Sequence, residues 1–461
     1  MLISNKIAIS KNDKYYSEIL NWCKSTLILD NPEYEKKLRM GLWLGKTPKK
    51  IYLYEENQDS LVLPFGAATE MCKYYSTTDI YTDFAHNEPI SIEGSINLYD
   101  YQQIALVKLL KARNGVLISP AGSGKTQIGI ALIKELGLKT LWLTHTSDLL
   151  SQSRDRFKEY CAANVGTITG GKVNIGDVTF ATVQTLCKLD LPLYAYEWDL
   201  IIVDECHKIA TVSQLSMFCK VLNNLKCRHK YGLTATYHRS DGMERGITAM
   251  LGDVIHEVPR SDVSERTVNP CIKKIELPTP KSFAYADTDG TLNFTKLVTY
   301  LANDAGRVAQ IVAHIAESPG CSQLVLSDRL DGLKAILAAL NDIGLGDIAV
   351  MIDGSMVSKQ GKANREQAIE DMRSGKKKIL LASYSLSKEG LDIPILSRLH
   401  LTTPVKDKAV VIQSVGRISR TCEDKPDAVV YDYLDREIGY CQNAFKKRCS
   451  HYKHINCRIL K

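Results

Sequence analysis

The sequence predicts an α/β protein: two doubly wound parallel-sheet domains in tandem, preceded by a small N-terminal α+β accessory domain. Ten short apolar runs, separated by helical stretches, carry this prediction. Such runs are typical of parallel strands covered on both faces, and their alternation with helices indicates the doubly wound arrangement. The runs are residues 115–118, 140–143, 178–182, 200–203 and 231–234 in the first domain, and 323–326, 347–352, 378–382, 398–401 and 428–431 in the second.

Changes in this pattern set the expected domain limits. Residues 258–271 replace periodicity with proline, serine and charged residues, so we expect the seam between the two sheets there. The pattern before residue 96 is different, with strands expected at 21–29, 50–54 and 61–66. The predicted domains are 1–95 (accessory, for DNA recognition), 96–262 (first sheet), 263–440 (second sheet) and 441–461 (a basic C-terminal tail).

Composition indicates a globular cytoplasmic protein. Of the 461 residues, 44% are hydrophobic and 24% are charged, and no apolar run reaches the roughly 20 residues that span a bilayer. The start of the chain lacks the apolar core of a signal peptide. None of the 13 cysteines forms a Cys-x-x-Cys pair, so we expect reduced thiols and neither a zinc nor an iron–sulfur site.

The net charge of +7 is mild, but it is unevenly distributed. Residues 1–95 hold slightly more acid than base, whereas the end of the chain after Arg436 is basic and carries interleaved aromatic residues. Two interpretations of this tail stay open: it lies along a phosphate backbone, or it is a solvated helix end.

A candidate phosphate loop, Ser-Pro-Ala-Gly-Ser-Gly-Lys-Thr, follows the first apolar run at residues 119–126. Its glycines allow the backbone to aim N–H groups inward, and the helix N-terminus that follows favours anions. The lysine is placed to reach the β- and γ-phosphates, and the threonine hydroxyl to bind Mg²⁺. Because Ser119 stands where the common motif has glycine, an ordinary turn is the alternative. The residues expected to hold the nucleotide are Gly122, Ser123, Gly124, Lys125 and Thr126.

Two adjacent carboxylates, Asp204 and Glu205, end the apolar run at 200–203. Ligands of open α/β sheets bind at the carboxyl ends of strands, so we expect Asp204 to hold the magnesium ion. Glu205 is then the candidate base that orients the attacking water. The alternative is a solvated acidic turn, and the nearby phosphate loop argues against it.

Four polar side chains complete the predicted nucleotide site. Gln102 lies shortly before the phosphate loop, and its amide can pair with adenine; the alternative is a surface glutamine on an amphipathic helix. Gln413, Arg417 and Arg420 are spaced to share one face of a helix over 413–420. We expect the two arginines to meet the γ-phosphate across an interdomain cleft, where an arginine finger raises the rate about 10³–10⁵-fold. A basic helix face in solvent or on DNA is the alternative.

The order of these elements resembles that of superfamily 2 helicases over most of residues 98–420, which implies two RecA-like domains. Within the superfamily, the Asp-Glu-Cys-His box at 204–207 and the Gln-Ser-Val-Gly-Arg helix are most similar to phage recombination helicases that remodel branched DNA. Leu-Pro-Phe-Gly at 63–66 also fits, although such relatives often carry Arg at the position of Phe65. The other matching segments are Leu-Thr-His-Thr at 143–146, Gly-Gly at 170–171, Ala-Thr-Val-Gln-Thr-Leu at 181–186, Leu-Thr-Ala-Thr at 233–236, Leu-Val-Leu-Ser-Asp at 324–328 and Ser-Lys-Glu-Gly-Leu-Asp-Ile-Pro at 387–394.

The resemblance implies further roles. Gly390 and Asp392 would touch both the ribose and the domain interface. Hydroxyl and amide side chains would hold the phosphate backbone without reading bases, although each can instead make a local turn or cap hydrogen bond. The residues implied for strand binding are Thr144, Thr182, Gln184, Ser327 and Ser383, and those implied for coupling nucleotide state to the strand are His207, Thr234 and Thr236.

The resemblance thus implies an ATP- and Mg²⁺-dependent DNA helicase or translocase that unwinds or branch-migrates forked and branched DNA. We expect a monomer without membrane contact, in the host cytoplasm if the chain is of phage origin. Three alternatives stay open: a double-stranded DNA translocase that never separates strands, an RNA helicase, and a binding module switched by ATP.

Overall fold

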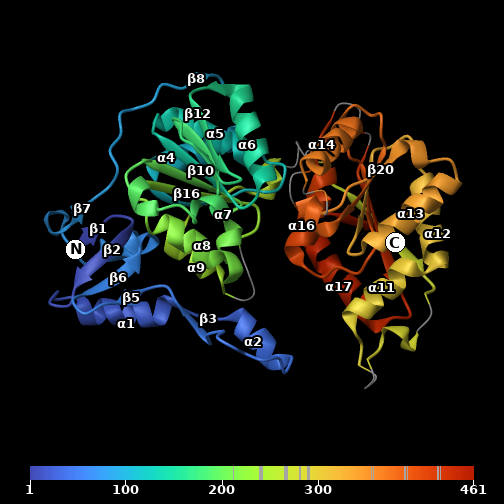
Figure 1. Ribbon diagram of the computed structural model, residues 1–461, viewed down its shortest axis with the longest axis horizontal. Coiled ribbons are helices and arrows are strands. Elements are labelled where there is room, and N and C mark those ends of the chain that lie inside the picture. Colours follow the sequence, from blue (N-terminus) through green and yellow to red (C-terminus); the bar gives the residue numbers. More distant parts are fainter. Residues whose placement is uncertain are drawn as a thin grey trace. The chain divides into compact units, whose positions relative to one another are not determined.

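The computed structural model consists of two compact units, each with its own sheet (Figure 1). The first unit is Met1–Pro120 with Gly124–Pro259, and the second is residues 121–123 with Arg260–Lys461. The predicted fold class is confirmed. The structure describes the whole chain except residues 211, 238–241, 264–267, 280–281, 288–290, 355, 357, 389–390, 392, 423–424, 426 and 461, and the side chains of 212–214, 283, 359, 362 and 387–388.

The main sheet of the first unit has the strand order β13-β12-β14-β10-β15-β16-β9-β17. Its strands pair in parallel, except that β13 is antiparallel to β12. The central strands are buried along their whole length, as continuous apolar runs require. The strands are β9 (Asn114–Ile118), β10 (Thr140–Thr144), β12 (Val165–Thr169), β13 (Lys172–Asn174), β14 (Val178–Thr182), β15 (Leu200–Asp204), β16 (His229–Thr234) and β17 (Val254–Glu257).

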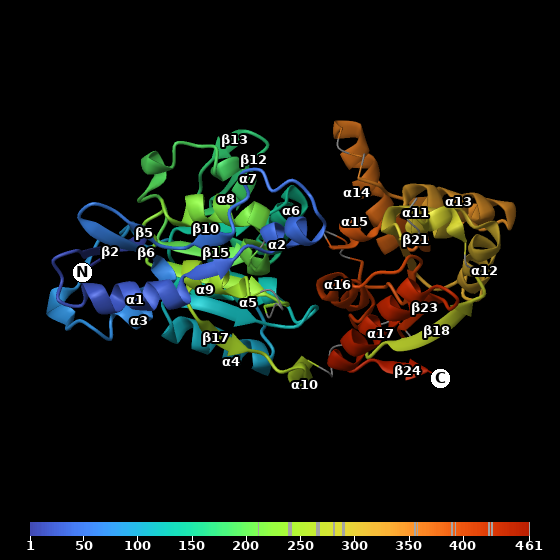
Figure 2. The same cartoon turned by 90° about the horizontal axis from the view of Figure 1, so that it is seen from below.

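Helices cover both faces of this sheet (Figures 1 and 2). Helices α4 (Asp100–Lys111), α5 (Lys125–Leu136) and α6 (Ser147–Tyr160) pack side by side on one face. The other face carries α7 (Val183–Leu186), α8 (Val212–Leu222) and α9 (Glu244–Leu251), with the 3₁₀ turns Leu191–Tyr194 and Cys206–Ala210. Helix α5 ends at Gly137, whose left-handed φ of 58° suits a glycine C-cap. A short ladder joins β8 (Glu93–Gly94) to β11 (Cys161–Ala162).

The N-terminal region forms a second, five-stranded sheet within the first unit, in the order β5-β6-β2-β1-β7. Its strands are β1 (Leu2–Ile3), β2 (Lys6–Ser10), β5 (Glu55–Glu56), β6 (Ser60–Pro64) and β7 (Tyr81–Thr82). Around them lie α1 (Tyr16–Thr26), α2 (Pro32–Arg39), α3 (Ala68–Met71), the 3₁₀ turns Phe65–Ala67 and Thr77–Asp79, and the pair β3 (Ile28–Asp30) and β4 (Lys50–Tyr52).

The strand predicted at 21–29 is wrong for most of its length. Residues up to Thr26 belong to helix α1, and only Ile28–Asp30 is a strand. The helix forms because Ile19 and Cys23, four residues apart, share one face and are both fully buried in the core. Tertiary packing of that face overrides the local preference for an extended chain.

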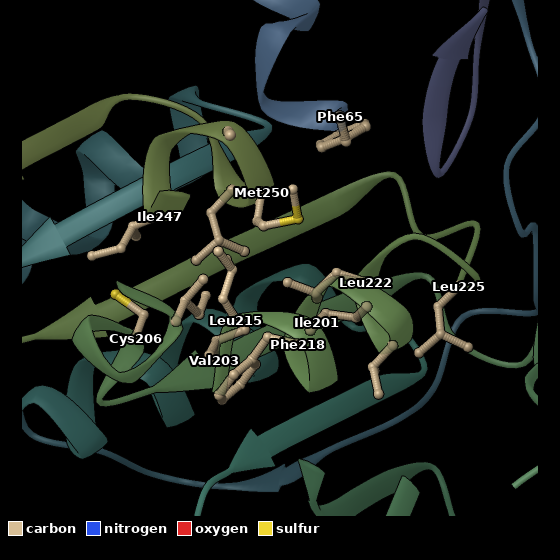
Figure 3. Packing of buried hydrophobic residues seen from close by; sticks show 14 of the residues in the cluster. Phe65, Ile201, Val203, Cys206, Leu215, Phe218, Leu222, Leu225, Ile247 and Met250 are labelled. Atoms are coloured by element: carbon tan, nitrogen blue, oxygen red, sulfur yellow. The ribbon is translucent and has the colours of Figure 1, made fainter. Parts of the chain in front are cut away.

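Phe65 anchors the N-terminal sheet on the first main sheet. It belongs to the same buried cluster as Phe218 and Met250 (Figure 3), and the Lys230 ammonium lies 4.3 Å from the centroid of its ring. At Gly66 a Cβ atom would collide with the backbone carbonyls of α9, so this close approach requires glycine. The Leu-Pro-Phe-Gly segment therefore docks one part of the first unit on another.

The second unit contains a seven-stranded parallel sheet in the order β20-β21-β19-β22-β23-β18-β24. Its strands are β18 (Cys271–Leu277), β19 (Gln323–Ser327), β20 (Ala349–Met351), β21 (Ile379–Ser383), β22 (Arg398–Leu401), β23 (Val429–Asp435) and β24 (Arg458–Leu460). Its helices are α10 (Arg260–Val263), α11 (Phe294–Asn303), α12 (Ala305–Ala316), α13 (Leu330–Asp342), α14 (Lys359–Arg373), α15 (Tyr384–Lys388), α16 (Lys408–Ile418) and α17 (Gly439–His454), with 3₁₀ turns at Phe283–Tyr285 and Gly346–Ile348.

The segment expected as a basic tail packs on this sheet as α17 and β24. Arg448 is only 1% exposed, and its guanidinium donates to both carboxylate oxygens of Asp432 on β23, at 2.6–3.1 Å. Tyr452 is also buried and donates to Asp432. Two of the residues that suggested a strand-binding tail are therefore part of the core, because α17 turns one face toward the sheet.

Candidate nucleotide site

The candidate site of the first unit lies where three neighbouring strands end. Strands β15, β16 and β9 are adjacent and parallel, so their carboxyl ends meet at one edge. The register pairs Asp204 with Leu233 and Thr234 with Ile118. The backbone N–H of Ser119 donates to the Thr234 carbonyl over 2.9 Å. The structure therefore brings the phosphate loop, the acidic pair and the Leu-Thr-Ala-Thr segment to the same place.

The phosphate loop has the backbone that its glycines predict. Gly122 and Gly124 have left-handed φ angles of 83° and 77°, which residues with a Cβ rarely adopt. Helix α5 then starts at Lys125, so unpaired N–H groups and the positive end of the helix dipole face the loop. Thr126 lies in this first turn. The arrangement suits a polyphosphate.

The acidic pair is buried. Asp204 is 5% exposed; it accepts hydrogen bonds from the Ser153 hydroxyl at 3.2 Å and from the backbone N–H of Glu205 at 3.0 Å. Burial, reinforced by the neighbouring Glu205 charge, raises the pKa of Asp204 to about 6. The Lys125 ammonium stands 3.9 Å from Glu205 Oε1. Burial opposes ionisation of Glu205 too, but Lys125 and His207 hold its pKa below the usual range.

Glu205 adopts a strained backbone conformation. Its φ of +50° lies in the left-handed region, and among the described non-glycine residues only Asn456 shares this feature. Such strain costs of order 1–3 kcal/mol and persists where the surroundings impose it. Here the turn after β15 aims the carboxylate toward Lys125, as the 3.9 Å approach shows.

The three residues implied for coupling form one polar chain that begins at Glu205. His207 Nδ1 lies 3.1 Å from Glu205 Oε2 and 3.1 Å from the Thr234 hydroxyl. That hydroxyl donates to the Thr236 carbonyl and accepts from the Thr236 N–H, both at 3.1 Å. Burial, as the largest cause, lowers the pKa of His207. A movement of the Glu205 side chain would thus alter the contacts of His207 and Thr234 and, through them, the turn after β16.

Gln102 is not the surface glutamine of the alternative interpretation, because it is only 1% exposed. Its side-chain oxygen accepts from the Tyr99 N–H at 3.0 Å, and its NH₂ group donates to Gln127 Oε1 at 3.3 Å. A Cβ atom on Gly124 would collide with this NH₂ group, so the amide lies directly against the phosphate loop. Gln127 and Ser153 are neighbours that sequence reasoning missed, since neither belongs to a recognisable motif.

The residues implied for strand binding occupy matching places in the two sheets. Thr144 and Thr182 end the neighbouring strands β10 and β14 and are register partners. Ser327 and Ser383 do the same for β19 and β21. Their hydroxyls make local hydrogen bonds: Thr144 to the Thr146 carbonyl, Thr182 to Thr185, Ser327 from the Arg329 N–H, and Ser383 with Ser385.

These local contacts limit what the side chains can do in this conformation. Thr144 is fully buried, so contact with a phosphate would require its hydroxyl to leave Thr146. The Gln184 amide likewise donates to the His145 carbonyl at 2.6 Å. Of the five side chains, Gln184 and Ser383 are half-buried, and the other three are buried.

The helix predicted over 413–420 is too long. Helix α16 ends at Ile418, so Gln413 and Arg417 share a face, but Arg420 lies beyond the helix. The reason is a cap: the Lys425 ammonium donates to the Ile418 and Arg420 carbonyls, at 2.5 and 2.8 Å, which ends the helix. The Arg417 guanidinium donates to the Leu391 carbonyl at 2.8 Å. The other two predicted ligands, Gly390 and Asp392, lie outside the described residues.

A phosphate loop after β9 and paired carboxylates after β15, with β16 between the two strands in one parallel sheet, define a RecA-like nucleoside triphosphatase. Two family models match the chain: the res subunit of type III restriction enzymes over residues 95–239, and the helicase conserved C-terminal domain over residues 307–422. The first match contains the phosphate loop and the acidic pair, and the second contains α16.

The relatives are helicases. The chain is 28% identical over 381 residues to the putative ATP-dependent RNA helicase L396 of Acanthamoeba polyphaga mimivirus, covering 79% of this chain and 69% of that protein. It is 24% identical over 462 residues to the ATP-dependent DNA helicase uvsW of Enterobacteria phage T4, covering 93% and 88%. The chain covers only part of three further relatives, which are also named helicases: 60%, 48% and 66% of their respective lengths.

Among solved structures, S. cerevisiae Dbp5 bound to RNA and ADP BeF3 matches with a TM-score of 0.55 and 16% identity, over 79% of this chain and 90% of that one, a likeness of fold. The chain belongs to the superfamily 2 helicases and is an ATP-dependent enzyme of that group. The predicted resemblance, including that to phage helicases, is confirmed. Each helix that the structure describes is too short or too polar to cross a membrane.

Proposed function

We propose that this protein is an ATP-driven DNA helicase or translocase that remodels forked or branched DNA. The observation that carries the proposal is the shared edge of β15, β16 and β9, where Lys125, Glu205 and Thr234 lie within one polar chain. A nucleotide bound there changes the charge beside Glu205, and the chain can pass that change to the turn after β16.

The residues at this edge fit a magnesium–triphosphate complex. The carboxylates of Asp204 and Glu205 are adjacent, and among the described residues the ammonium paired with them is that of Lys125, 3.9 Å from Glu205. Oxygen ligands and an excess of negative charge are what Mg²⁺ prefers. Asp204 and the Thr126 hydroxyl would hold the ion, which when bound neutralises the charge of the phosphates. Lys125 would grip the β- and γ-phosphates, and Glu205 would orient the attacking water.

The second unit would complete the reaction. We assign Arg417 and Arg420 to the transition-state charge on the γ-phosphate, with Gln413 beside them. Gly122, Ser123 and Gly124 would wrap the phosphates, Gln102 would pair with the adenine, and Gly390 and Asp392 would meet the ribose. Hydrolysis removes the γ-phosphate, the arginines lose their ligand, and the two units separate.

The strand-end hydroxyls of both units support movement along one nucleic-acid strand. The pairs Thr144–Thr182 and Ser327–Ser383 occupy equivalent positions in the two sheets, so each unit can hold the same backbone in turn. Contacts of this kind do not depend on sequence. Closing and opening would then ratchet the protein along the strand, as a monomer. During branch migration each broken base pair is replaced by another, so ATP mainly supplies direction.

DNA is the proposed substrate because the phage T4 relative, which the alignment covers over 88% of its length, is named a DNA helicase. RNA is the second candidate, because the mimivirus relative is named a putative RNA helicase. A double-stranded DNA translocase that leaves strands paired is the third.

The test compares ATPase stimulation by single strands, duplexes, forks and four-way junctions of DNA and by matching RNAs, together with strand displacement on a forked duplex. We expect forked or four-way DNA to stimulate most and the fork to be opened. Stimulation by RNA alone would contradict the choice of DNA, and stimulation by duplexes without displacement would favour the translocase. Biological activity that survives Glu205→Gln would instead favour an ATP-switched binding module.

A further inference from the structure

The N-terminal region carries one tryptophan that the fold leaves in solvent. Trp43 is 88% exposed, whereas Trp142 and Trp198 are fully buried. It lies in the segment that contains α2 and runs from the end of β3 to the first residue of β4, here called the α2 arm (residues 31–50). This arm extends away from the N-terminal sheet (Figures 1 and 2). The neighbouring Met40 and Leu42 are 60% and 52% exposed. Exposed apolar groups gathered in this way mark a binding surface.

Trp43 lies next to Gly45 of the same arm. Gly45 has a left-handed φ of +52°, and a Cβ placed on it would lie 2.9–3.2 Å from atoms of the indole ring. The indole ring therefore lies close to the Gly45 backbone, and most of its surface is exposed to solvent. Because only a glycine leaves room for the ring there, the geometry presents a flat aromatic surface to solvent.

The arm is ordered by hydrogen bonds at its base. Helix α2 ends at a left-handed Gly41, and the Leu42 N–H donates to the Lys37 carbonyl at 2.9 Å, as in a Schellman cap. The buried Asn31 side chain donates to the Pro48 carbonyl at 2.8 Å. The Lys37 ammonium also reaches the Thr47 hydroxyl at 2.7 Å. The exposed Trp43 ring is thus part of a loop that several hydrogen bonds stabilise.

Charge on the arm is one-sided. Residues 36–50 contain six of the eleven basic residues of region 1–95 and no acid, although the region as a whole has more acids than bases. Lys37 and Lys50 pair with Glu33 and Asp30. Lys36, Arg39, Lys46 and Lys49 are exposed, and among the described residues no carboxylate lies within ion-pair distance of them. The surface is complementary to a polyanion.

We propose that Trp43 stacks on an unpaired base of single-stranded DNA while the lysines and arginine of the α2 arm hold the flanking phosphates. A positive groove with an aromatic platform is how proteins bind single strands without reading sequence. This proposal rests on the proposed function, since it takes DNA as the substrate. It places a contact for the separated strand outside both main sheets, on the region expected to recognise the junction.

The experiment uses intrinsic fluorescence of the full-length protein, titrated at low salt and without ATP with oligo(dT) and with vesicles containing phosphatidylserine. We expect oligo(dT) to quench the tryptophan emission, Trp22→Phe to keep the quench and Trp43→Phe to remove it, because the other two tryptophans are buried. Trp43→Ala should weaken binding of a forked DNA by roughly 5–150-fold, the range expected for one stacked base. Trp43→Phe should keep most of the affinity, and Trp43→Leu should not.

A second variant tests the charges. Lys46→Gln with Lys49→Gln should reduce the salt dependence of single-strand binding by roughly 1.4 in the log–log slope, since each phosphate contact contributes about 0.7. Three outcomes would each overturn the proposal. They are quenching by oligo(dT) that persists in Trp43→Phe, equal DNA affinity of Trp43→Leu and Trp43→Phe, and quenching by vesicles but not by DNA. These outcomes are separate from a failure of the proposed function, in which DNA would not stimulate the ATPase of the unaltered protein.

Discussion

The two units share a sheet topology but treat buried charge in opposite ways. In the second unit, Arg448 and Asp432 are 1% and 0% exposed and are joined by short guanidinium–carboxylate hydrogen bonds, so their charges cancel. In the first unit, Asp204 and Glu205 are adjacent at the end of β15, and the Lys125 ammonium remains 3.9 Å away. Among the described residues, no basic side chain forms an ion pair with Asp204.

This difference separates structural charges from functional ones. A buried pair that is fully neutralised serves the fold, and removing one partner leaves an unpaired charge. In the first unit two carboxylates are adjacent at a strand end, and the pKa of Asp204 is raised while that of Glu205 is lowered. This pattern is typical of a functional site that binds a cationic ligand. The comparison predicts that substitutions of Lys125 and Glu205 abolish activity and leave stability intact, and that substitution of Arg448 does the reverse.

The first prediction concerns the phosphate-loop variant Lys125→Ala. ATP hydrolysis should fall by at least about 10²–10³-fold, since the variant loses a preorganised charge at the phosphates. Steady-state ATPase measurements check this, with Lys134→Ala, in the last turn of the same helix, as the matched control. Normal ATP turnover by Lys125→Ala would contradict the assignment of the nucleotide site to this edge of the sheet.

Glu205→Gln should lower the ATPase rate by about 10²–10⁴-fold, the usual contribution of a general base, while nucleotide binding persists. Loss of the neighbouring negative charge should also lower the pKa of Asp204 from about 6. The thermal midpoint should stay unchanged or rise, because a like-charge contact is removed. A variant that unfolds, or that hydrolyses ATP normally, would assign Glu205 a structural role.

Arg448→Met should destabilise the second unit by about 3–5 kcal/mol, because Asp432 is left buried and unpaired. Urea unfolding followed by circular dichroism measures the loss. The double variant Arg448→Met with Asp432→Leu should recover most of it, and the ATPase rate per folded molecule should remain within a few-fold of normal. A large loss of activity at full stability would show that this pair is not merely structural.

The smallest effect is expected from Thr234→Val, which keeps the shape of the side chain but removes the hydroxyl between His207 and Thr236. One hydrogen bond contributes about 0.5–1.5 kcal/mol, so DNA stimulation of the ATPase should fall by roughly 2–12-fold. Basal hydrolysis should change less, because Lys125 and Glu205 are untouched. Thr167→Val, on the partly exposed strand β12 of the same unit, is the control; equal loss in both variants would argue against a specific relay.

Sequence alone predicted the parts of the fold that are locally determined. The ten apolar runs all correspond to strands, because strands covered on both faces are apolar along their length. Of the edge strands of the two main sheets, β20 was predicted, but β13, β17 and β24 were missed, because exposed strands carry polar residues. Strand β18 was missed for the same reason, since Lys273 and Lys274 interrupt its apolar pattern.

The candidate site shows the same limit. The phosphate loop and the acidic pair were predictable because each is a continuous motif at a strand end. Ser153 was not, because only the packing of α6 against the sheet brings its hydroxyl to Asp204. The end of α16 could not be predicted either, because the residue that caps it, Lys425, lies beyond the helix in the sequence. The exposure of Trp43 could not be predicted from the surrounding sequence, because it depends on the hydrogen-bonded conformation of the α2 arm.

The most direct test of the account is the ATPase rate of a variant in which Arg417→Ala and Arg420→Ala are combined, measured with saturating single-stranded DNA and with nucleotide binding followed in parallel. If the acidic edge of the first unit needs cations from the second, hydrolysis should fall by about 10³–10⁵-fold while nucleotide still binds. Arg436→Ala, an exposed residue of the second unit, is the control. Hydrolysis at the normal rate by the double variant would contradict the division of labour between the two units.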